Sequence, residues 1–275
     1  MICRALPNEI VAANMVRRVL RAIRDESRAQ NVEVAGESLQ RLVQAATVRR
    51  ATLGAAATDL REPIRDHIAE LVAEVESSSE SICSSAHSHV HADELILTYG
   101  ASELVEQFLK AAAPRGFKLV HAAGPDVNKS HAMSERLSHA GISVTVIAPQ
   151  AMFAFMSRVN KVVIGVRAVL AGGGLLGEAG ASLATGAAHF YSVPVIALAP
   201  LYMLSPLHAC DQQQFNELGD PRQVMTYQSH VYAPLYDPVP SEHVTLFITN
   251  LGGSSPSYVY RLLSELYDPN DNQLL

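Results

Sequence analysis

Six short runs of apolar, mostly β-forming residues follow one another after His91, and this alternation most restricts the fold. They cover Leu95 to Thr98, Phe117 to His121, Ile142 to Ala148, Lys161 to Gly165, Val193 to Ala199 and Val244 to Thr249. Helix-length segments between and after them include Ser102 to Ala113, Lys129 to Ala140 and Ser257 to Tyr267. Buried strands alternating with helices are typical of a parallel sheet covered on both faces. Residues 91–275 are therefore predicted to form a doubly wound, mainly parallel, Rossmann-like α/β domain.

Residues 1–90 have a helical period instead. Between Asn8 and Arg28, apolar residues recur at helical spacing, and four arginines are expected to lie largely away from them. The apolar residues are Val11, Met15, Val16, Leu20 and Ile23, and the arginines are Arg17, Arg18, Arg21 and Arg24. Two further stripes are Leu39, Leu42, Val43 and Ala46, then Ile64, Ile68, Leu71, Val72 and Val75. The sequence predicts a domain of amphipathic helices, the third closing near Glu80.

The composition favours a soluble globular protein over a nucleic-acid-binding or membrane protein. With 48% hydrophobic and 17% charged residues the chain can bury a core, and a net charge of −6 gives no general reason to expect nucleic-acid binding. Cys3, Cys83 and Cys210 form no CxxC pair, so reduced thiols are expected. No apolar run reaches the ~20 residues that span a bilayer, and Arg4 and Glu9 interrupt any signal peptide. These features predict a soluble cytoplasmic protein that does not bind a membrane.

A glycine-rich segment, Gly172 to Gly177, satisfies GxGxxG spacing. A dinucleotide site also needs an acidic residue about 20 residues further on, but Val193 to Ala199 contains none. The segment could still hold a phosphate through free N–H groups if it led into a helix. Tight packing of the turn against the sheet explains it equally simply and is slightly favoured.

Two other polar clusters are candidate sites. His87, His89 and His91 would present three imidazoles on one face of an extended segment, as in a metal site, but a polar helix end followed by a connector is the favoured interpretation. The turn Asn250-Leu251-Gly252-Gly253 lies at the predicted carboxyl edge of the sheet, where ligands bind in open α/β folds. A turn into the last helix explains it as well, so both remain open. Asp211 to Tyr232 is expected to be a long surface loop.

Three long runs resemble one family: the alpha, beta and delta subunits of eukaryotic translation initiation factor 2B, which are related to methylthioribose-1-phosphate and ribose-1,5-bisphosphate isomerases. The runs cover 14–20, 155–165 and 199–206, and with the tail 250–267 they are most similar to beta members. The resemblance covers nearly the whole chain and implies an isomerase or CoA-transferase-like fold. Beta members carry more helical sequence before residue 14, so a shortened helical domain or a fragment is expected.

The resemblance also implies that catalysis has been lost. Where the isomerases have a catalytic cysteine after the first strand, this chain has Gly100. Where the isomerases have their catalytic aspartate, this chain has Arg167, in Gly165-Val166-Arg167-Ala168. Gly124 lies in the stretch 122–125, which matches their phosphate-binding arginine motif. No catalytic residue, cofactor or metal ligand is therefore expected, although an active isomerase and a metabolite sensor without turnover remain alternatives.

The implied role is that of a regulatory subunit of a guanine-nucleotide exchange factor. Its partners would be the delta subunit, as a heterodimer, and the alpha, gamma and epsilon subunits, with initiation factor 2 as client. Glu70 is expected to face the alpha subunit of initiation factor 2. An interface with delta is predicted at the last strand, the turn with Asn250, Gly252 and Gly253, and the last helix, whose apolar and aromatic residues suit interfaces. These include Tyr258, Leu262 and Leu266.

Overall fold

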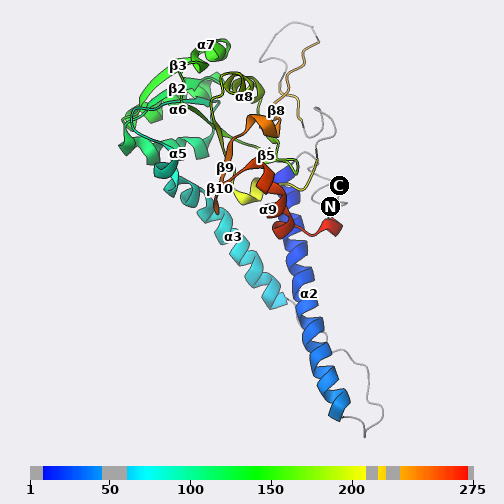
Figure 1. The fold of residues 1–275 in the computed structure, drawn as a ribbon. Coiled ribbons are helices and arrows are strands. Elements are labelled where there is room, and N and C mark those ends of the chain that lie inside the picture. The colour runs from blue at the N-terminus through cyan, green and yellow to red at the C-terminus, as the bar shows by residue number, and fades with distance from the viewer. Residues whose placement is uncertain (1–8, 45–60, 209–215, 221–229, 272–275) are drawn as a thin grey trace.

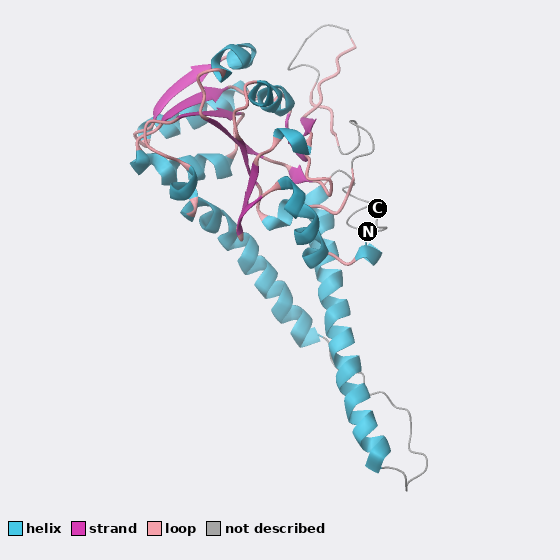
Figure 2. Cartoon of the chain, viewed as in Figure 1, coloured by secondary structure: helices cyan, strands magenta, loops and turns pink. Residues whose placement is uncertain are grey.

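The computed structural model describes residues 9–44, 61–208, 216–220 and 230–271. Two long helices, α2 (Ile10–Gln44) and α3 (Arg61–Ser84), extend from an α/β domain that contains all the strands (Figure 1). Figure 2 shows the separation between the helical projection and the magenta sheet. Among the helices in the described ranges, none is both long and apolar enough for a membrane crossing.

Seven strands form the main sheet, in the order β10-β9-β7-β4-β1-β2-β3. They are β1 (Leu95–Tyr99), β2 (Lys118–Ala122), β3 (Ser143–Ile147), β4 (Lys161–Gly165), β7 (Val195–Leu198), β9 (Leu246–Thr249) and β10 (Gly252–Ser254). All neighbouring pairs are parallel except β9 with β10. The six predicted strands are thus confirmed within a few residues at their ends.

Helices cover both faces of this sheet. The helices that follow α3 are α4 (Ala86–His89), α5 (Glu103–Ala112), α6 (Val127–His139), α7 (Met152–Met156), α8 (Ala181–Phe190) and α9 (Val259–Leu266). Alternate strand residues enter different cores: Ile96 packs with α5 and α6, whereas Leu97 packs with α7, α8 and α9. Because successive side chains of a strand point to opposite faces, this arrangement is a doubly wound fold, as predicted.

A second, three-stranded sheet was not predicted. It consists of β5 (Ala168–Val169), β6 (Leu175–Glu178) and β8 (Tyr236–Val239), all antiparallel. The glycine-rich segment leads into β6 and not into a helix, so the phosphate-turn interpretation is wrong. A side chain at Gly173, where φ is +76°, would lie 2.7 Å from the Pro256 carbonyl oxygen. Close packing requires glycine at this position, in agreement with the favoured interpretation.

Helix α2 buries a different face from the one predicted. It is continuous to Gln44, so the stripes beginning at Val11 and Leu39 lie on one helix; Ala46 is outside the described residues. Asn14 and Arg17 are buried, at 0% and 1% exposure, whereas Val16, Leu20 and Ile23 are only half-buried. The prediction that the arginines lie away from the packed face is therefore wrong. The reason is that acidic residues near the end of the chain pack against this side.

Helix α3 leaves most of its predicted apolar stripe uncovered. Leu71 is buried, but Ile68 and Val72 are 41% and 51% exposed. The helix itself is confirmed, because 3.6-residue periodicity depends on local sequence. Its contact with α2 includes a two-bond ion pair from Arg18 to Glu74, at 2.6 and 3.1 Å.

Candidate functional site

A cavity of about 470 Å³ opens at the carboxyl ends of β1 and β4, where ligands bind in open α/β sheets. Parallel strands bring their carboxyl ends to one edge, so residues distant in sequence meet there. The cavity is lined by Tyr99, Ala101, Ser102, Lys129, Ile164, Gly165, Val166, Arg167, Glu178, Ala181 and Tyr236. Gly100 and Gly124 lie beside Glu178 at the same edge. The sequence analysis singled out Gly100, Gly124 and Arg167. The structure brings the first two of them next to the carboxyl group of Glu178.

Gly100 follows β1 directly and has a φ of +72°, which residues other than glycine rarely adopt. Its carbonyl accepts a hydrogen bond from Nε2 of the buried His121, at 2.8 Å. Burial lowers the pKa of His121, which favours its neutral form. Both ends of the ring are occupied, since Nδ1 lies 2.6 Å from the Ser134 hydroxyl. His121 therefore supports the turn and has no free nitrogen to act as a base.

Glu178, at the end of β6, is the site residue that the sequence analysis missed. Its Oε2 accepts a hydrogen bond from the N–H of Ala101, at 3.3 Å. A methyl group added to Gly100 would overlap that oxygen, and one added to Gly124 would lie 3.0 Å from it. Burial raises the pKa of the carboxyl group. The only sequence signal was the position of Glu178 immediately after the glycine-rich segment.

Arg167 lies on the wall of the cavity and contacts the residue that precedes α2. Its guanidinium forms an ion pair with Glu9, immediately before α2, and lies 5.4 Å from the centre of the Tyr236 ring. The side chain is 32% exposed. Both contacts restrain this cation on the wall of the cavity, where it offers no carboxylate for proton transfer.

The three histidines do not form the extended face that a metal cluster would need. His87 and His89 belong to the short helix α4, and His91 follows it. Across the described residues, no group of three or more His, Cys, Asp or Glu side chains could hold a metal ion. Cys83 is half-buried, and burial raises the pKa of its thiol; Cys3 and Cys210 lie outside the described residues.

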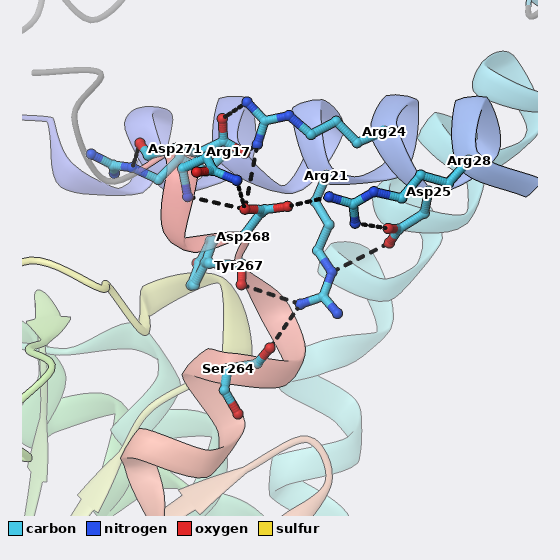
Figure 3. A network of polar contacts seen from close by, with 10 residues as sticks. Arg17, Arg21, Arg24, Asp25, Arg28, Ser264, Tyr267, Asp268 and Asp271 are labelled. Carbon is cyan, nitrogen blue, oxygen red and sulfur yellow. Dashed lines mark hydrogen bonds and ion pairs between the residues drawn. The ribbon is translucent and has the colours of Figure 1, made fainter.

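A second polar centre joins α2 to the end of the chain, and Figure 3 shows it. We call Arg17, Arg21, Arg24 and Arg28, together with Asp268 and Asp271, the arginine clasp. Arg24 pairs with Asp271 at 2.6 Å, and Arg28 pairs with Asp268 at 3.3 Å. Arg21 donates to the carbonyl oxygens of Ser264 and Tyr267, at 3.1 and 3.4 Å, at the end of α9. Cations at this position favour a helix carboxyl terminus.

Comparisons with known proteins agree with both parts of the fold. A family model described as the initiation factor 2 subunit family matches residues 1–256. The chain belongs to this family. Translation initiation factor eIF2B subunit beta of Dictyostelium discoideum is 42% identical over 220 residues, 77% of this chain, and the match spans 57% of that relative's length.

Two solved structures of family members share the fold. The crystal structure of eIF2B beta from Chaetomium thermophilum has a TM-score of 0.77 and 28% identity, covering 98% of this chain and 76% of that one. The tetrameric eIF2B-beta2-delta2 complex from C. thermophilum gives 0.74 and 30%, covering 96% and 76%. The family resemblance predicted from the sequence is confirmed, and each of these three comparisons includes an eIF2B beta subunit.

The residues predicted to meet the delta subunit of the family divide into buried and exposed groups. Leu262 is 6% exposed and belongs to the core beneath α9, and Leu266 is partly buried against that core. Tyr258 and Tyr260 are 40% and 75% exposed. A partner could reach the tyrosines directly, but not the side chain of Leu262.

The Asn250 turn has an internal structural role. The Asn250 side-chain oxygen accepts from the N–H of Leu201, at 3.0 Å, which links the turn to the loop after β7. Gly252 has a φ of +113° and, with Gly253, forms β10. Leu251, which precedes them, is 72% exposed. The turn therefore holds an apolar side chain on the surface.

Glu70 lies on α3, and its side chain is 79% exposed. His67 Nδ1 is 3.8 Å away, which is too long for a strong contact. Glu70 therefore belongs to the solvated side of the helix and is available to a partner.

Proposed function

We propose that the chain is a non-catalytic regulatory subunit of the eIF2B guanine-nucleotide exchange factor, which supports GDP/GTP exchange on initiation factor 2 and its regulation by phosphorylation. Similarity to eIF2B beta along almost the whole chain supports this role. The subunit would form a heterodimer with delta, which is supported by the presence of both subunit types in the tetrameric beta2-delta2 complex from C. thermophilum. The alpha, gamma and epsilon subunits complete the proposed complex, in the cytoplasm.

The proposal that the chain is non-catalytic rests on the residues at the carboxyl-edge cavity. Gly100 and Arg167 lie where the resemblance places the cysteine and aspartate of the isomerases, and Gly124 lies in the stretch of the phosphate-binding arginine. A general acid or base typically contributes about 10²–10⁴-fold to a rate. A charge-assisted contact to an anion contributes ~1.5–3 kcal/mol. A chain that lacks the cysteine, the aspartate and the phosphate-binding arginine together is not expected to have isomerase activity.

We further propose that the two parts of the chain divide the work. The helical domain, residues 1–90, would present Glu70 to initiation factor 2, and the α/β domain, residues 91–275, would bind delta. The exposed Tyr258, Tyr260 and Leu251 support a surface near α9 for the second contact. No nucleic acid or membrane is needed for either role.

Affinity purification of the tagged chain from its native cytoplasm tests the assignment. The expected result is stoichiometric recovery of the delta subunit together with the other three subunits, and exchange activity on initiation factor 2 in the eluate. A monomeric chain, or one recovered with unrelated proteins only, would contradict the proposal.

An isomerase assay tests the alternative activity. The purified chain should not convert ribose-1,5-bisphosphate or methylthioribose-1-phosphate faster than a buffer blank. Turnover that disappears on substitution of Arg167 or a neighbouring cavity residue would show an active enzyme and overturn the non-catalytic assignment.

A further inference from the structure

Glu178 extends a carboxyl group into a space that glycines leave open. Two positions on neighbouring loops, Gly100 after β1 and Gly124 after β2, both lack the Cβ atom that would meet its Oε2. Gly100 also has the left-handed φ of +72°. The two glycines and the glutamate therefore fit one another, and a side chain at Gly100 is incompatible with this position of the carboxyl group.

The backbone that carries Glu178 is fixed on several sides. Glu178 pairs with Tyr236 in the β6–β8 register. The next residue, Ala179, donates its N–H to the Leu235 carbonyl at 2.9 Å and accepts a hydrogen bond from the Tyr99 hydroxyl. Gly180 then donates to the Asp237 carboxylate at 2.7 Å. These bonds fix the backbone from which the Glu178 side chain reaches the edge of the sheet, and the Ala101 N–H contacts its carboxyl group at 3.3 Å.

Three neighbours act on the charge of the Glu178 carboxyl group. The Ala101 N–H donates to it, and Lys129 acts on it through space, whereas Asp126 repels it. Arg167 on the cavity wall is paired with Glu9. A second anion entering the cavity would thus meet the Glu178 carboxylate and two cations, Arg167 and Lys129. Each of these cations is already paired with another carboxylate, Arg167 with Glu9 and Lys129 with Asp126. Two negative charges in one cavity repel each other more strongly than in bulk water, because the effective dielectric constant of the cavity is lower.

We propose that Glu178 is an internal ligand of the carboxyl-edge cavity: its carboxyl group fills the space between Gly100 and Gly124 and excludes phosphate monoesters. The inference rests on the proposed non-catalytic function and adds a cause for it. Glycine at position 100 is then required by this position of Glu178, whereas a side chain at Gly124 would meet the Cα of Gly100 first, at 2.8 Å, and Oε2 of Glu178 at 3.0 Å. Restoring a single side chain at Gly100 therefore cannot rebuild the site.

Phosphate binding tests the exclusion. The full chain, with its co-purified subunits, would be titrated with inorganic phosphate and with ribose 5-phosphate by calorimetry, as the unsubstituted form and as Glu178→Ala, Glu178→Gln and Glu242→Ala. The last removes an exposed glutamate elsewhere on the surface. Glu178→Ala should bind at least about tenfold more tightly than the unsubstituted chain, a change of ~1.4 kcal/mol. Glu178→Gln, which keeps the bulk, should gain less, and Glu242→Ala should match the unsubstituted chain.

A double-substitution cycle tests the fit separately from any ligand. Gly116 has a φ of +71°, like Gly100, but a side chain there would meet nothing within 4 Å. Gly116→Ala therefore reports backbone strain alone, whereas Gly100→Ala adds the overlap with Glu178. In a Glu178→Ala background, the loss of unfolding midpoint caused by Gly100→Ala should fall by at least about half, and that caused by Gly116→Ala should not change. If Gly100→Ala alone fails to fold, recovery of folded protein in the double variant serves as the same readout.

The outcomes distinguish this inference from the proposed function. Equal phosphate binding with and without Glu178, no binding by any variant, or no rescue in the cycle would each overturn the internal-ligand proposal and leave the non-catalytic assignment intact. Isomerase turnover by the unsubstituted chain would instead overturn the proposed function.

Discussion

Nη2 of Arg24 lies 2.6 Å from Oδ1 of Asp271, joining α2 to the last described turn of the chain. The Asp271 side chain is 1% exposed and that of Arg24 is 36% exposed. Arg17, almost fully buried, donates from Nε to the Asp271 carbonyl at 3.3 Å. The N–H of Asn270 and the charges of Arg24 and Arg28 hold the pKa of Asp268 below its ordinary value. The arginine clasp therefore joins α2 to the end of α9 and to the residues that follow it.

Substituting Asp271 by Asn should weaken this contact. It removes a buried charge and leaves Arg24 without its closest ionic partner, which we expect to lower the free energy of unfolding by on the order of 1–3 kcal/mol. Urea unfolding at pH 7 measures the change. Glu62→Gln is the control, because its pair with Arg65 is 71% and 72% exposed and should contribute less than about 1 kcal/mol. Equal losses in the two variants would show that the clasp does not stabilise the fold.

Glu106 should make stability depend on pH in the acid range. Its carboxylate accepts from Arg136 at 2.7 and 2.8 Å and from Lys110 at 2.7 Å, and the hydrogen bonds from Arg136, with those from Lys110, lower its pKa to about 2. Because the folded pKa lies below the unfolded value of about 4.3, the ionised group stabilises the fold above the unfolded pKa. This contribution is lost as the pH falls through the folded value.

The test of this contribution compares two glutamates on α5. Glu106→Gln should cost roughly 2 kcal/mol at pH 7, and the difference from the unsubstituted chain should shrink as the pH falls from about 5 towards 2. Exposed Glu103→Gln should cost little at either end of the range. If the difference in the free energy of unfolding between Glu106→Gln and the unsubstituted chain does not change with pH, ionisation of Glu106 is not the source of the acid dependence.

Reversing the charge of Glu70 tests the proposed contact with initiation factor 2. Glu70→Lys should weaken binding of the assembled complex to its substrate by about tenfold or less and leave the unfolding midpoint unchanged, because a solvated helix position rarely affects stability. The measurement is surface binding at two salt concentrations. Glu76→Lys, also exposed on α3, is the matched control. If both variants bind normally, Glu70 is a solvated residue only.

The exposed tyrosines beside α9 provide a cleaner test of the delta interface than the leucines do. Changing Tyr258 and Tyr260 together to Ser should reduce recovery of delta by about 30-fold or more, since buried aromatic side chains at interfaces often contribute at least ~2 kcal/mol. Tyr232→Ser, at a similarly exposed position, controls for surface loss of a tyrosine. Leu262→Asp would damage the subunit's own core and so cannot separate folding from assembly. Normal recovery of delta with the double variant would place the interface elsewhere.

Local sequence pattern accounts for much of what was predicted. The period of two residues in a strand and of 3.6 in a helix depends on near neighbours, so the six runs from Leu95 to Thr249 and the helix over 64–75 were found. The glycine-rich segment was harder, because a turn into a strand and a turn into a helix use the same residue types. The short β5 carries too few residues to show any period.

The sequence by itself determined six strands of the main sheet with the helices between them, the family and the absence of a carboxylate at Arg167, because each depends on neighbouring residues. Only the tertiary structure decided which face of α2 is buried, since Arg17 finds Asp271 at the far end of the chain. It also brought Glu178 to Gly100. Both contacts join segments that are distant in sequence, so no local periodicity predicts them. Packing of the whole chain decides which side chains come into contact.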